Sequence, residues 1–430
     1  MALSLSLLGS GVWLVAVVWQ VIELRGGPIE LSFVAALASL GLTVTVLFGG
    51  VVADRVSHKH ILITVETTKS VAIAVGAALA LSGTLEIWHL AIISLVLGIA
   101  DGFFYPAYSA LLPTILPAEQ LLAANGVEGV LRPAVMQAAG PALASAAIAA
   151  FSPGIAFAVT ALSQAIGVGV LSAMRGRAAS RDEVDAAESA DAAGDNGTNT
   201  VHPIRALFHD LGEGFSYMWK TPWLLGTLLF APVLILIIMG PIEVLLPFAV
   251  KNQTGGGAGA FALALAAFGV GGAAGSLLIA SLPLPRRYLT LMVLLWGGGC
   301  LPLAIIGITD NLWLMVIALF VVGFAFSAAT VIWGTLLQRR VPRALLGRIS
   351  SLDFFMSLAF TPVSMALAGP VAALIGIAPT FAIAGLVSPL LAVATVFLAG
   401  MPRDEIAHPL EVPTANQAAG AEDEPGDRVA

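Results

Sequence analysis

Long apolar stretches recur from one end of this sequence to the other, separated only by short polar breaks. A stretch of about 18 apolar residues is long enough to cross the hydrocarbon core of a bilayer as a helix. Of the 430 residues, 58% are hydrophobic and only 10% are charged, which lies outside the range of soluble globular domains. The pattern predicts an all-α polytopic membrane protein.

Dividing the sequence at its polar breaks predicts twelve membrane-spanning helices. The first has no basic segment before it and no small-residue cleavage site after it, so we expect it to be retained rather than removed as a signal peptide. Cys300 is the single cysteine and is expected to be a small apolar residue in a helix. The expected spans are 3–24, 29–53, 60–82, 87–111, 122–150, 154–174, 223–250, 258–282, 288–307, 312–337, 345–375 and 378–400.

Lysine and arginine sort strongly between the two sides of this twelve-span topology. Only Arg25 and Lys251 fall in odd-numbered loops, and Lys69 and Arg132 lie within spans. Basic residues accumulate on the cytoplasmic side of membrane proteins, so both termini are expected to be cytoplasmic and the protein to lie in the inner (plasma) membrane. The other basic residues lie in the termini and even-numbered loops: Arg55, Lys59, Arg175, Arg177, Arg181, Arg205, Lys220, Arg286, Arg287, Arg339, Arg340, Arg343, Arg348, Arg403 and Arg428.

Two acidic segments interrupt the apolar pattern. Residues 176–202 and 401–430 contribute −4 and −5 to the net charge, and their Ala-, Asp-, Glu- and Gly-rich composition is typical of disordered linkers and tails. Apolar residues at helical spacing over 204–218 predict an interfacial helix, or a simple extension of the seventh span. The expected organisation is a six-helix bundle (1–175), a cytoplasmic linker with this helix (176–222), a second six-helix bundle (223–400) and a disordered cytoplasmic tail (401–430).

The loop after the second span carries an unusual concentration of charge. Its pattern Gly50-x-x-x-Asp54-Arg55, followed by His58-Lys59, resembles the loop signature of the major facilitator superfamily, with Ser57 in place of the usual glycine. "ALLPTILPAEQLL" (110–122) and "TLLQRRVPRALLG" (335–347) match at a constant offset, as expected of two duplicated halves. The resemblance implies the major facilitator fold, two six-helix bundles that alternate around a central site.

Further stretches resemble one branch of that superfamily, the drug:proton antiporter-3 group, which includes macrolide, multidrug and enterobactin exporters. They include "FFYPAYSALLPTILP" (103–117), "GEGFSYMWKTPWLLGTLL" (212–229) and "LLGRISSLDFFMS" (345–357). The exporter motif of the fifth span is kept at Gly140-Pro141, whereas its trailing Gly-Gly is replaced by Ala144-Ser145.

The loop carboxylate has a physical use in this family. Asp54 is expected to meet the unpaired N–H groups at the start of the eleventh span, with Arg348 as an ion-pair partner, and so to clamp the two bundles together on the cytoplasmic side. Gly50 belongs to the same motif, and Arg55 and Lys59 would contact lipid headgroups. The alternative is that these charges only anchor the topology.

Ionisable groups within spans are costly and are treated first as functional hypotheses. Glu66 and Lys69, three residues apart, and Glu128 and Arg132, four apart, are expected to form structural ion pairs on single helices. Asp101 has no basic residue within one turn of its own helix, and burial favours the neutral form of a carboxyl group, so it is the first proton-coupling candidate. A carboxyl group hydrogen-bonded to a neighbouring helix is the alternative.

Glu23 and Glu243, expected toward the outer ends of the first and seventh spans, are the next proton-coupling candidates. An apolar cavity with a few polar groups would suit amphiphilic ligands. The residues expected to line such a cavity are Trp19, Gln20, Phe104, Tyr105, Tyr108 and Trp333.

The expected function is secondary active efflux of amphiphilic small molecules or drugs, driven by proton influx through alternating access. Export of one metabolite or siderophore is the alternative within this class. A lipid-acting enzyme is disfavoured because no set of catalytic groups, metal-binding cluster or Walker loop is evident. A receptor that signals through its tail is disfavoured because the acidic tail shows no pattern expected to fold. We expect no cofactor other than the proton gradient, no metal and no nucleic acid, with small-molecule substrates, membrane lipids and a monomeric state.

Overall fold

The computed structural model describes residues 2–53, 55–115, 120, 128, 131–173 and 215–410. Twelve helical segments in this part of the chain are long and apolar enough to cross a membrane, as the sequence predicts. The expected interfacial helix falls largely outside the described residues, although residues 215–220 are helical.

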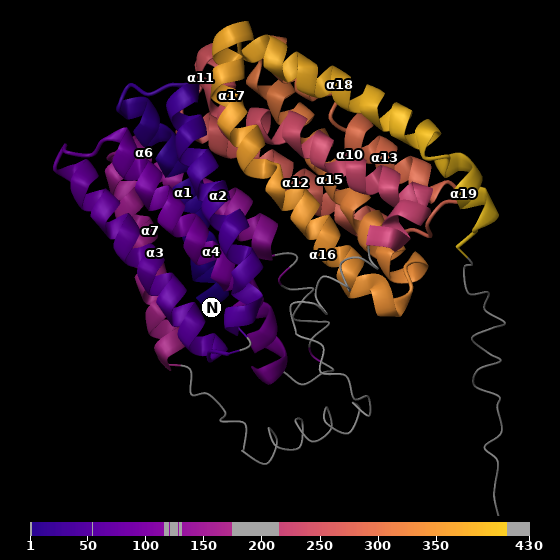
Figure 1. The fold of residues 1–430 in the computed structure, drawn as a ribbon. Coiled ribbons are helices and arrows are strands. Elements are labelled where there is room, and N and C mark those ends of the chain that lie inside the picture. Colours follow the sequence, from indigo (N-terminus) through magenta and orange to yellow (C-terminus); the bar gives the residue numbers. More distant parts are fainter. Residues whose placement is uncertain are drawn as a thin grey trace, which may run out of the picture.

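The first six spans are built from seven helical elements. They pack as one group (indigo to magenta in Figure 1), which we call the N-bundle. The elements are α1 (Ala2–Glu23), α2 (Pro28–Ala53), α3 (His58–Leu81), α4 (Ile87–Ile115), the π-helix η1 (Arg132–Ala139), α6 (Gly140–Ala150) and α7 (Pro153–Ala173).

The last six spans form a second group, the C-bundle (pink to yellow in Figure 1). Three of these spans are interrupted: the seventh by a π-helix, the ninth by a turn and the eleventh at Phe360. The elements are α10 (Pro222–Gly240), the π-helix η2 (Pro241–Leu245), α11 (Leu246–Thr254), α12 (Ala258–Ser281), α13 (Tyr288–Gly298), α14 (Leu303–Ile308), α15 (Leu312–Arg340), α16 (Arg343–Ala359), α17 (Thr361–Ile375), α18 (Ile377–Leu398) and α19 (Met401–Ala407).

Helix α19 corrects the expected boundary of the tail. Residues 401–407 were expected to be disordered, yet they form a helix that packs against α13 and α18. Gly400 adopts a positive φ of 61°, which turns the chain out of α18. Met401 and Glu405 are both buried. These two buried side chains hold the short helix against the C-bundle.

Each bundle contains a close helix–helix contact at a glycine, and the two contacts involve equivalent pairs of spans. In the N-bundle, α2 packs along α4, where a Cβ atom on Gly98 would lie only 1.9 Å from the carbonyl oxygen of Ala38. In the C-bundle, α12 packs along α15, where a Cβ atom on Gly271 would lie 2.1 Å from the carbonyl oxygen of Phe320. Small residues let helix backbones approach closely within a membrane. The same solution at spans two and four and at spans eight and ten fits a duplicated architecture.

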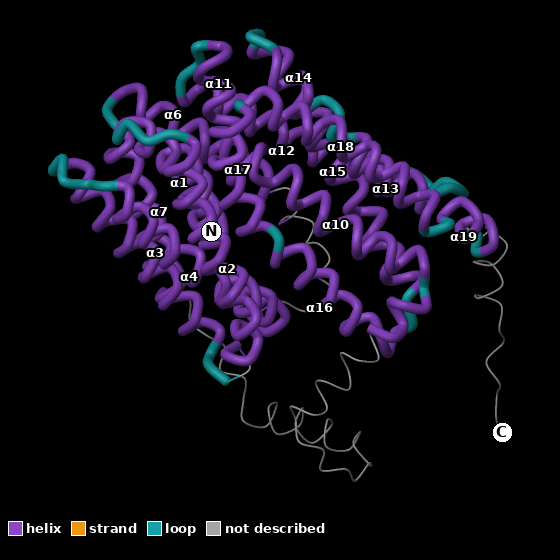
Figure 2. The backbone as a smooth tube through the Cα atoms, turned by 45° about the horizontal axis from the view of Figure 1, so that its top comes forward, coloured by secondary structure: helices purple, strands orange, loops and turns teal. Residues whose placement is uncertain are grey.

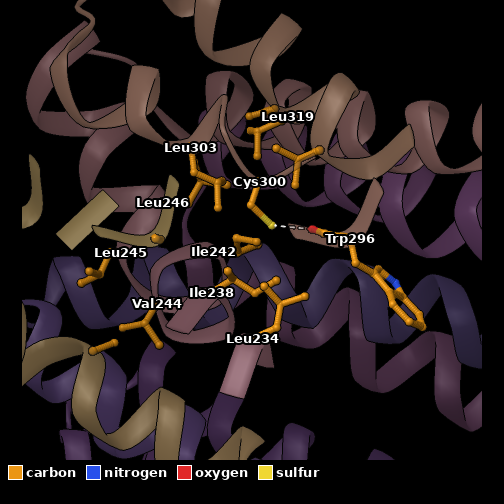
Figure 3. Packing of buried hydrophobic residues seen from close by; sticks show 14 of the residues in the cluster. Leu234, Ile238, Ile242, Val244, Leu245, Leu246, Trp296, Cys300, Leu303 and Leu319 are labelled. Atoms are coloured by element: carbon orange, nitrogen blue, oxygen red, sulfur yellow. Dashed lines mark hydrogen bonds between the residues drawn. The ribbon is translucent and has the colours of Figure 1, made fainter. Parts of the chain in front are cut away.

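The apolar core extends through both bundles and encloses the only cysteine. Cys300 is buried in the turn between α13 and α14, rather than in a helix, and its thiol donates a hydrogen bond to the carbonyl oxygen of Trp296 at 3.1 Å (Figure 3). Leu234, Ile238 and Leu319 belong to the cluster around it. The thiol is therefore part of the packing.

The two bundles touch mainly at one face of the membrane. We call the face that holds the loop between α1 and α2 the Arg25 side, and the face that holds the loop between α2 and α3 the Arg55 side. The backbone N–H of Gly369 in α17 donates a hydrogen bond to Ser32 Oγ in α2 at 2.6 Å. Figures 1 and 2 show the bundles converging near α11 and α17, on the Arg25 side, and diverging toward the end where α16 lies.

Candidate functional site

A cavity of about 310 Å³ lies between the N-bundle and the facing helices of the C-bundle. Most of its wall comes from α1, α2, α3 and α4, and the C-bundle contributes only Glu243, Leu358, Thr361 and Met365. The wall is largely apolar. Its polar and ionisable members are Ser10, Ser39, Lys69, Ser94, Asp101, Gln164, Glu243 and Thr361.

Lys69 and Asp101 form an ion pair in the wall of this cavity. The Nζ atom of Lys69 lies 2.8 Å from Oδ1 of Asp101, and the two side chains are 4% and 37% exposed. The Nζ atom also lies 5.8 Å from the ring centroid of Phe104. Asp101 therefore has a cationic partner on the neighbouring helix α3, whereas the spacing of charges along its own helix predicts none.

The expected ion pair between Glu66 and Lys69 is not the one that forms. Glu66 Oε1 accepts a hydrogen bond of 2.6 Å from Ser6 Oγ in α1, while its Oε2 atom is buried without a hydrogen-bond partner. The ammonium group of Lys69 pairs with Asp101 because helix packing brings α4 alongside α3. Glu66 is thus a buried carboxyl group on the helix that carries the lysine, in addition to the partly exposed Asp101 on α4.

Glu243 also lies in the cavity wall, rather than at the outer end of its span. It belongs to the π-helix η2, which begins at Pro241, a residue that lacks the N–H needed for a regular helical hydrogen bond. Its carboxylate makes no hydrogen bond or ion pair with any other residue that the structure describes. Within the described part of the chain, the cavity wall therefore has one carboxyl group in an ion pair and one without, on opposite bundles.

Several buried polar groups of the wall have no hydrogen-bond partner among the residues that the structure describes. Both amide atoms of Gln164 and the hydroxyl oxygens of Ser39 and Ser94 are buried without a hydrogen bond. All three residues line the cavity. Because an unsatisfied buried polar atom is costly, this region is suited to water or to the polar groups of a ligand.

The fifth span contains the ion pair expected within one helix. The Nη2 atom of Arg132 lies 2.6 Å from Oε1 of Glu128, and Nη1 donates a hydrogen bond of 2.8 Å to the hydroxyl group of Tyr105. Further along, a Cβ atom on Gly140 would lie 2.7 Å from the Cα atom of Gly11, so this glycine permits close contact between α6 and α1. Pro141 beside it is buried.

The aromatic and amide residues expected in the cavity lie elsewhere. None of the six is among the residues that line it. Trp19 stacks on Phe261 at 5.7 Å, and Trp333 donates a hydrogen bond to Asp353 at 2.9 Å. Gln20 and Phe104 are buried, and Tyr105 and Tyr108 pack around Phe104.

The clamp hypothesis falls partly outside the described residues, because Asp54 is not among them. Gly50 is in the last turns of α2, and Arg55 is exposed. Lys59 Nζ donates a hydrogen bond of 3.2 Å to the carbonyl oxygen of Ser172, at the end of α7. Arg348 lies in α16 and is partly exposed.

Glu23 is exposed near the end of α1 and does not line the cavity. Within the described ranges, no three His, Cys, Asp or Glu side chains gather closely enough to hold a metal ion.

Comparisons with known proteins agree with this architecture. The multidrug efflux pump Tap of Mycolicibacterium fortuitum is 26% identical over 402 residues, which cover 91% of this chain and 92% of that protein. Crystal structures of the nucleoside transporter NupG and of a point mutant superpose with TM-scores of 0.69 and 0.70, at 14% and 12% identity. Each superposition covers 92% of this chain, together with 98% of the NupG chain and 99% of the mutant chain.

A sequence profile of the Major Facilitator Superfamily matches residues 1–358. The match spans most of the chain, and the twelve-span fold agrees with it. Proteins of this superfamily are transporters rather than enzymes. The chain therefore belongs to the Major Facilitator Superfamily.

Proposed function

We propose that this chain is a secondary active efflux transporter that exchanges protons for amphiphilic small molecules by alternating access. The cavity is large enough for a small ligand and offers an apolar wall with a few polar groups. It lies between two bundles that touch mainly on the Arg25 side, which is the arrangement that a rocking motion requires. The multidrug efflux function named for Tap supports export as the direction.

The observation that carries the proposal is the Lys69–Asp101 pair in the cavity wall. Asp101 is partly exposed to the cavity, whereas Lys69 is almost fully buried. An ionised carboxyl group neutralises the lysine, and a protonated one releases it, so a single proton changes the charge of the wall. Such a group can couple proton uptake to the binding or release of a substrate. Glu243, unpaired on the other bundle, is the second coupling candidate, and Glu23 the third.

The remaining features of the proposal concern placement in the membrane. The sorting of lysine and arginine favours a plasma-membrane protein with both termini in the cytoplasm, so the Arg55 side would be cytoplasmic. Asp54, with Gly50, Arg55, Lys59 and Arg348, is proposed to clamp that side when it closes. We propose a monomer that contacts membrane lipids and takes its energy from the proton gradient.

Transport into inverted membrane vesicles with an imposed proton gradient tests the proposal. Dyes, macrolides, tetracyclines and siderophores would be screened at several gradients. The parent protein should accumulate at least one amphiphilic substrate only when the vesicle interior is acidic. Accumulation independent of the gradient between pH 6 and 8 would refute proton antiport.

The variant Asp101→Asn separates coupling from binding. It mimics a permanently protonated carboxyl group, so uphill transport should fail while binding and downhill exchange persist. Asp310→Asn, the same change at an exposed acid outside the cavity wall, is the matched control and should pump like the parent. If Asp101→Asn pumps against a gradient as well as the parent, Asp101 is not the coupling group.

A narrow substrate range would favour the second candidate function. Accumulation of one siderophore or metabolite, with no response to dyes or macrolides, would identify a dedicated exporter. The unpartnered atoms of Gln164, Ser39 and Ser94 are the observation that allows this possibility, because they could satisfy the polar groups of one specific ligand.

A further inference from the structure

Three ionisable side chains form a network at the wall of the cavity. Lys69 pairs with Asp101 across helices, while Glu66 lies three residues before Lys69 on α3. One Glu66 oxygen is bound by Ser6 and the other has no hydrogen-bond partner. The network therefore holds one cation and two carboxyl groups, with the second carboxyl group only half used.

We propose that the ammonium group of Lys69 has two positions. It pairs with Asp101 when Asp101 is ionised, and it pairs with Glu66 when Asp101 is protonated. Glu66 is then the positioning residue that holds the ammonium group away from the cavity. The use of this exchange in transport rests on the proposed function, but the exchange itself does not.

The geometry of α3 allows the exchange without movement of the backbone. Side chains three residues apart lie on the same face of a helix, so rotation about the side-chain bonds of Lys69 is enough to change its partner. The free Oε2 atom of Glu66 is available as the acceptor. A Cβ atom on Gly167 would lie 3.8 Å from this oxygen, and the glycine leaves that space empty.

Electrostatics gives Glu66 its role. Lys69 is almost fully buried, so protonation of Asp101 without a second partner would leave an unpaired ammonium group inside the bundle, which is strongly unfavourable. The carboxylate of Glu66 balances the charge of the Lys69 ammonium group when Asp101 is protonated. Among the described residues, the other ionisable groups that face the network are Tyr105 on α4 and Glu243 across the cavity.

The exchange changes the charge presented to the cavity. With Asp101 ionised, the network carries a net charge of −1, and the ammonium group stands at the cavity wall. With Asp101 protonated, the network is neutral and the ammonium group is withdrawn toward Ser6 and Glu66. One proton therefore removes two charged groups from the wall, and a substrate would meet a more apolar surface.

Thermal unfolding of the purified full-length protein in detergent tests the exchange directly. The variants are Asp101→Asn, Glu66→Gln, the double variant, and the triple variant with Lys69→Met. Each single variant leaves the lysine one carboxylate and should melt close to the parent. The double variant strands the lysine and should melt about 5 °C or more below the sum of the single shifts. The triple variant should recover most of that loss.

Additive shifts in the double variant would show that Lys69 does not use Glu66, and would overturn the inference. If the double variant cannot be purified, recovery of folded protein by Lys69→Met supports the inference, and failure to recover it refutes it. Neither outcome depends on transport, so the inference can fail while the proposed function stands.

A transport measurement separates positioning from simple stabilisation. Without Glu66, protonation of Asp101 becomes harder, so the pH midpoint of uphill transport by Glu66→Gln should move about one unit or more toward acid. Asp310→Asn, an exposed acid outside the cavity wall, should leave the midpoint unchanged. A Glu66→Gln protein with the parental midpoint would show that Glu66 is structural only. A parent with no proton dependence would refute the proposed function, while the unfolding experiment would still decide the lysine exchange.

Discussion

Glu405 is expected to be one of the strongest single contributors to the stability of the C-bundle. This residue of α19 is 1% exposed, and its Oε2 atom accepts hydrogen bonds from the backbone N–H groups of Leu289 and Thr290, at 2.9 and 3.0 Å. Its Oε1 atom accepts a third from the hydroxyl group of Thr290 at 2.8 Å. These N–H groups lie in the first turn of α13, where a helix has no internal acceptors for them.

The size of the effect follows from these contacts. A hydrogen bond to a charged group contributes about 1.5–3 kcal/mol, and a carboxylate at a partly buried helix start gains up to about 2 kcal/mol from the helix dipole. Because such terms are not additive, we expect Glu405→Ala to lower the free energy of unfolding by about 3–5 kcal/mol. At about 2–4 °C per kcal/mol, its melting temperature should fall by at least about 6 °C.

Melting in detergent, followed by the fluorescence of a thiol-reactive dye at Cys300, measures this shift. The buried thiol becomes reactive only when the C-bundle opens. Glu405→Gln keeps one acceptor oxygen and should lie between Glu405→Ala and the parent. Asp310→Asn, an exposed acid whose side chain makes no hydrogen bond or ion pair with a described residue, is the control and should melt with the parent. A Glu405→Ala protein that melts within about 1 °C of the parent would refute this reasoning.

The remaining predictions concern topology and alternating access. A cysteine introduced at Gly256 in a cysteine-free protein should be labelled from outside intact cells and one at Ser57 should not; the reverse would overturn the orientation. Asp54→Asn should reduce transport sharply at near-normal abundance, whereas unchanged transport would leave the loop as a topology anchor. A Cβ atom on Gly369 would lie 2.5 Å from a backbone oxygen of α2, so Gly369→Ala should expose cavity cysteines to outside reagents. Gly334→Ala, with open space around it, should not.

The span pattern could be predicted from the sequence because it depends on one-dimensional properties. The length of each apolar stretch and the side that holds the lysines and arginines are readable without any knowledge of packing. The pair of Glu128 and Arg132 was accessible for the same reason, since helical periodicity alone brings residues four apart together. The prediction that residues 401–407 are disordered was wrong, because Glu405 is held by a hydrogen-bond partner that lies more than a hundred residues away in the sequence.

The composition of the cavity could not be predicted in this way. Lys69 and Asp101 meet because α3 packs against α4, and no local spacing indicates which face of each helix the other one covers. Glu243 turns into the wall within a π-helix, for which Pro241 is at most a weak signal. Aromatic residues were expected in the wall, but Trp19 and Trp333 find ring or carboxylate partners in the packed interior. Gln164 is the most buried polar residue of the wall, and no sequence pattern around it predicts a place in the cavity.

The two carboxyl groups of the cavity belong to different bundles, and this gives the proposed mechanism a way to link protonation to conformation. Asp101 is carried by α4 and Glu243 by η2, so a rocking motion of one bundle against the other changes the distance between them. The repulsion between two ionised carboxylates grows as they approach, and more steeply where water is excluded. A conformation that brings them together therefore favours the protonated form of one of them, and a conformation that separates them favours proton release. Lys69 pairs with Asp101, whereas Glu243 has no ion-pair partner among the described residues, so the protonation of Glu243 is the one that depends most directly on this movement.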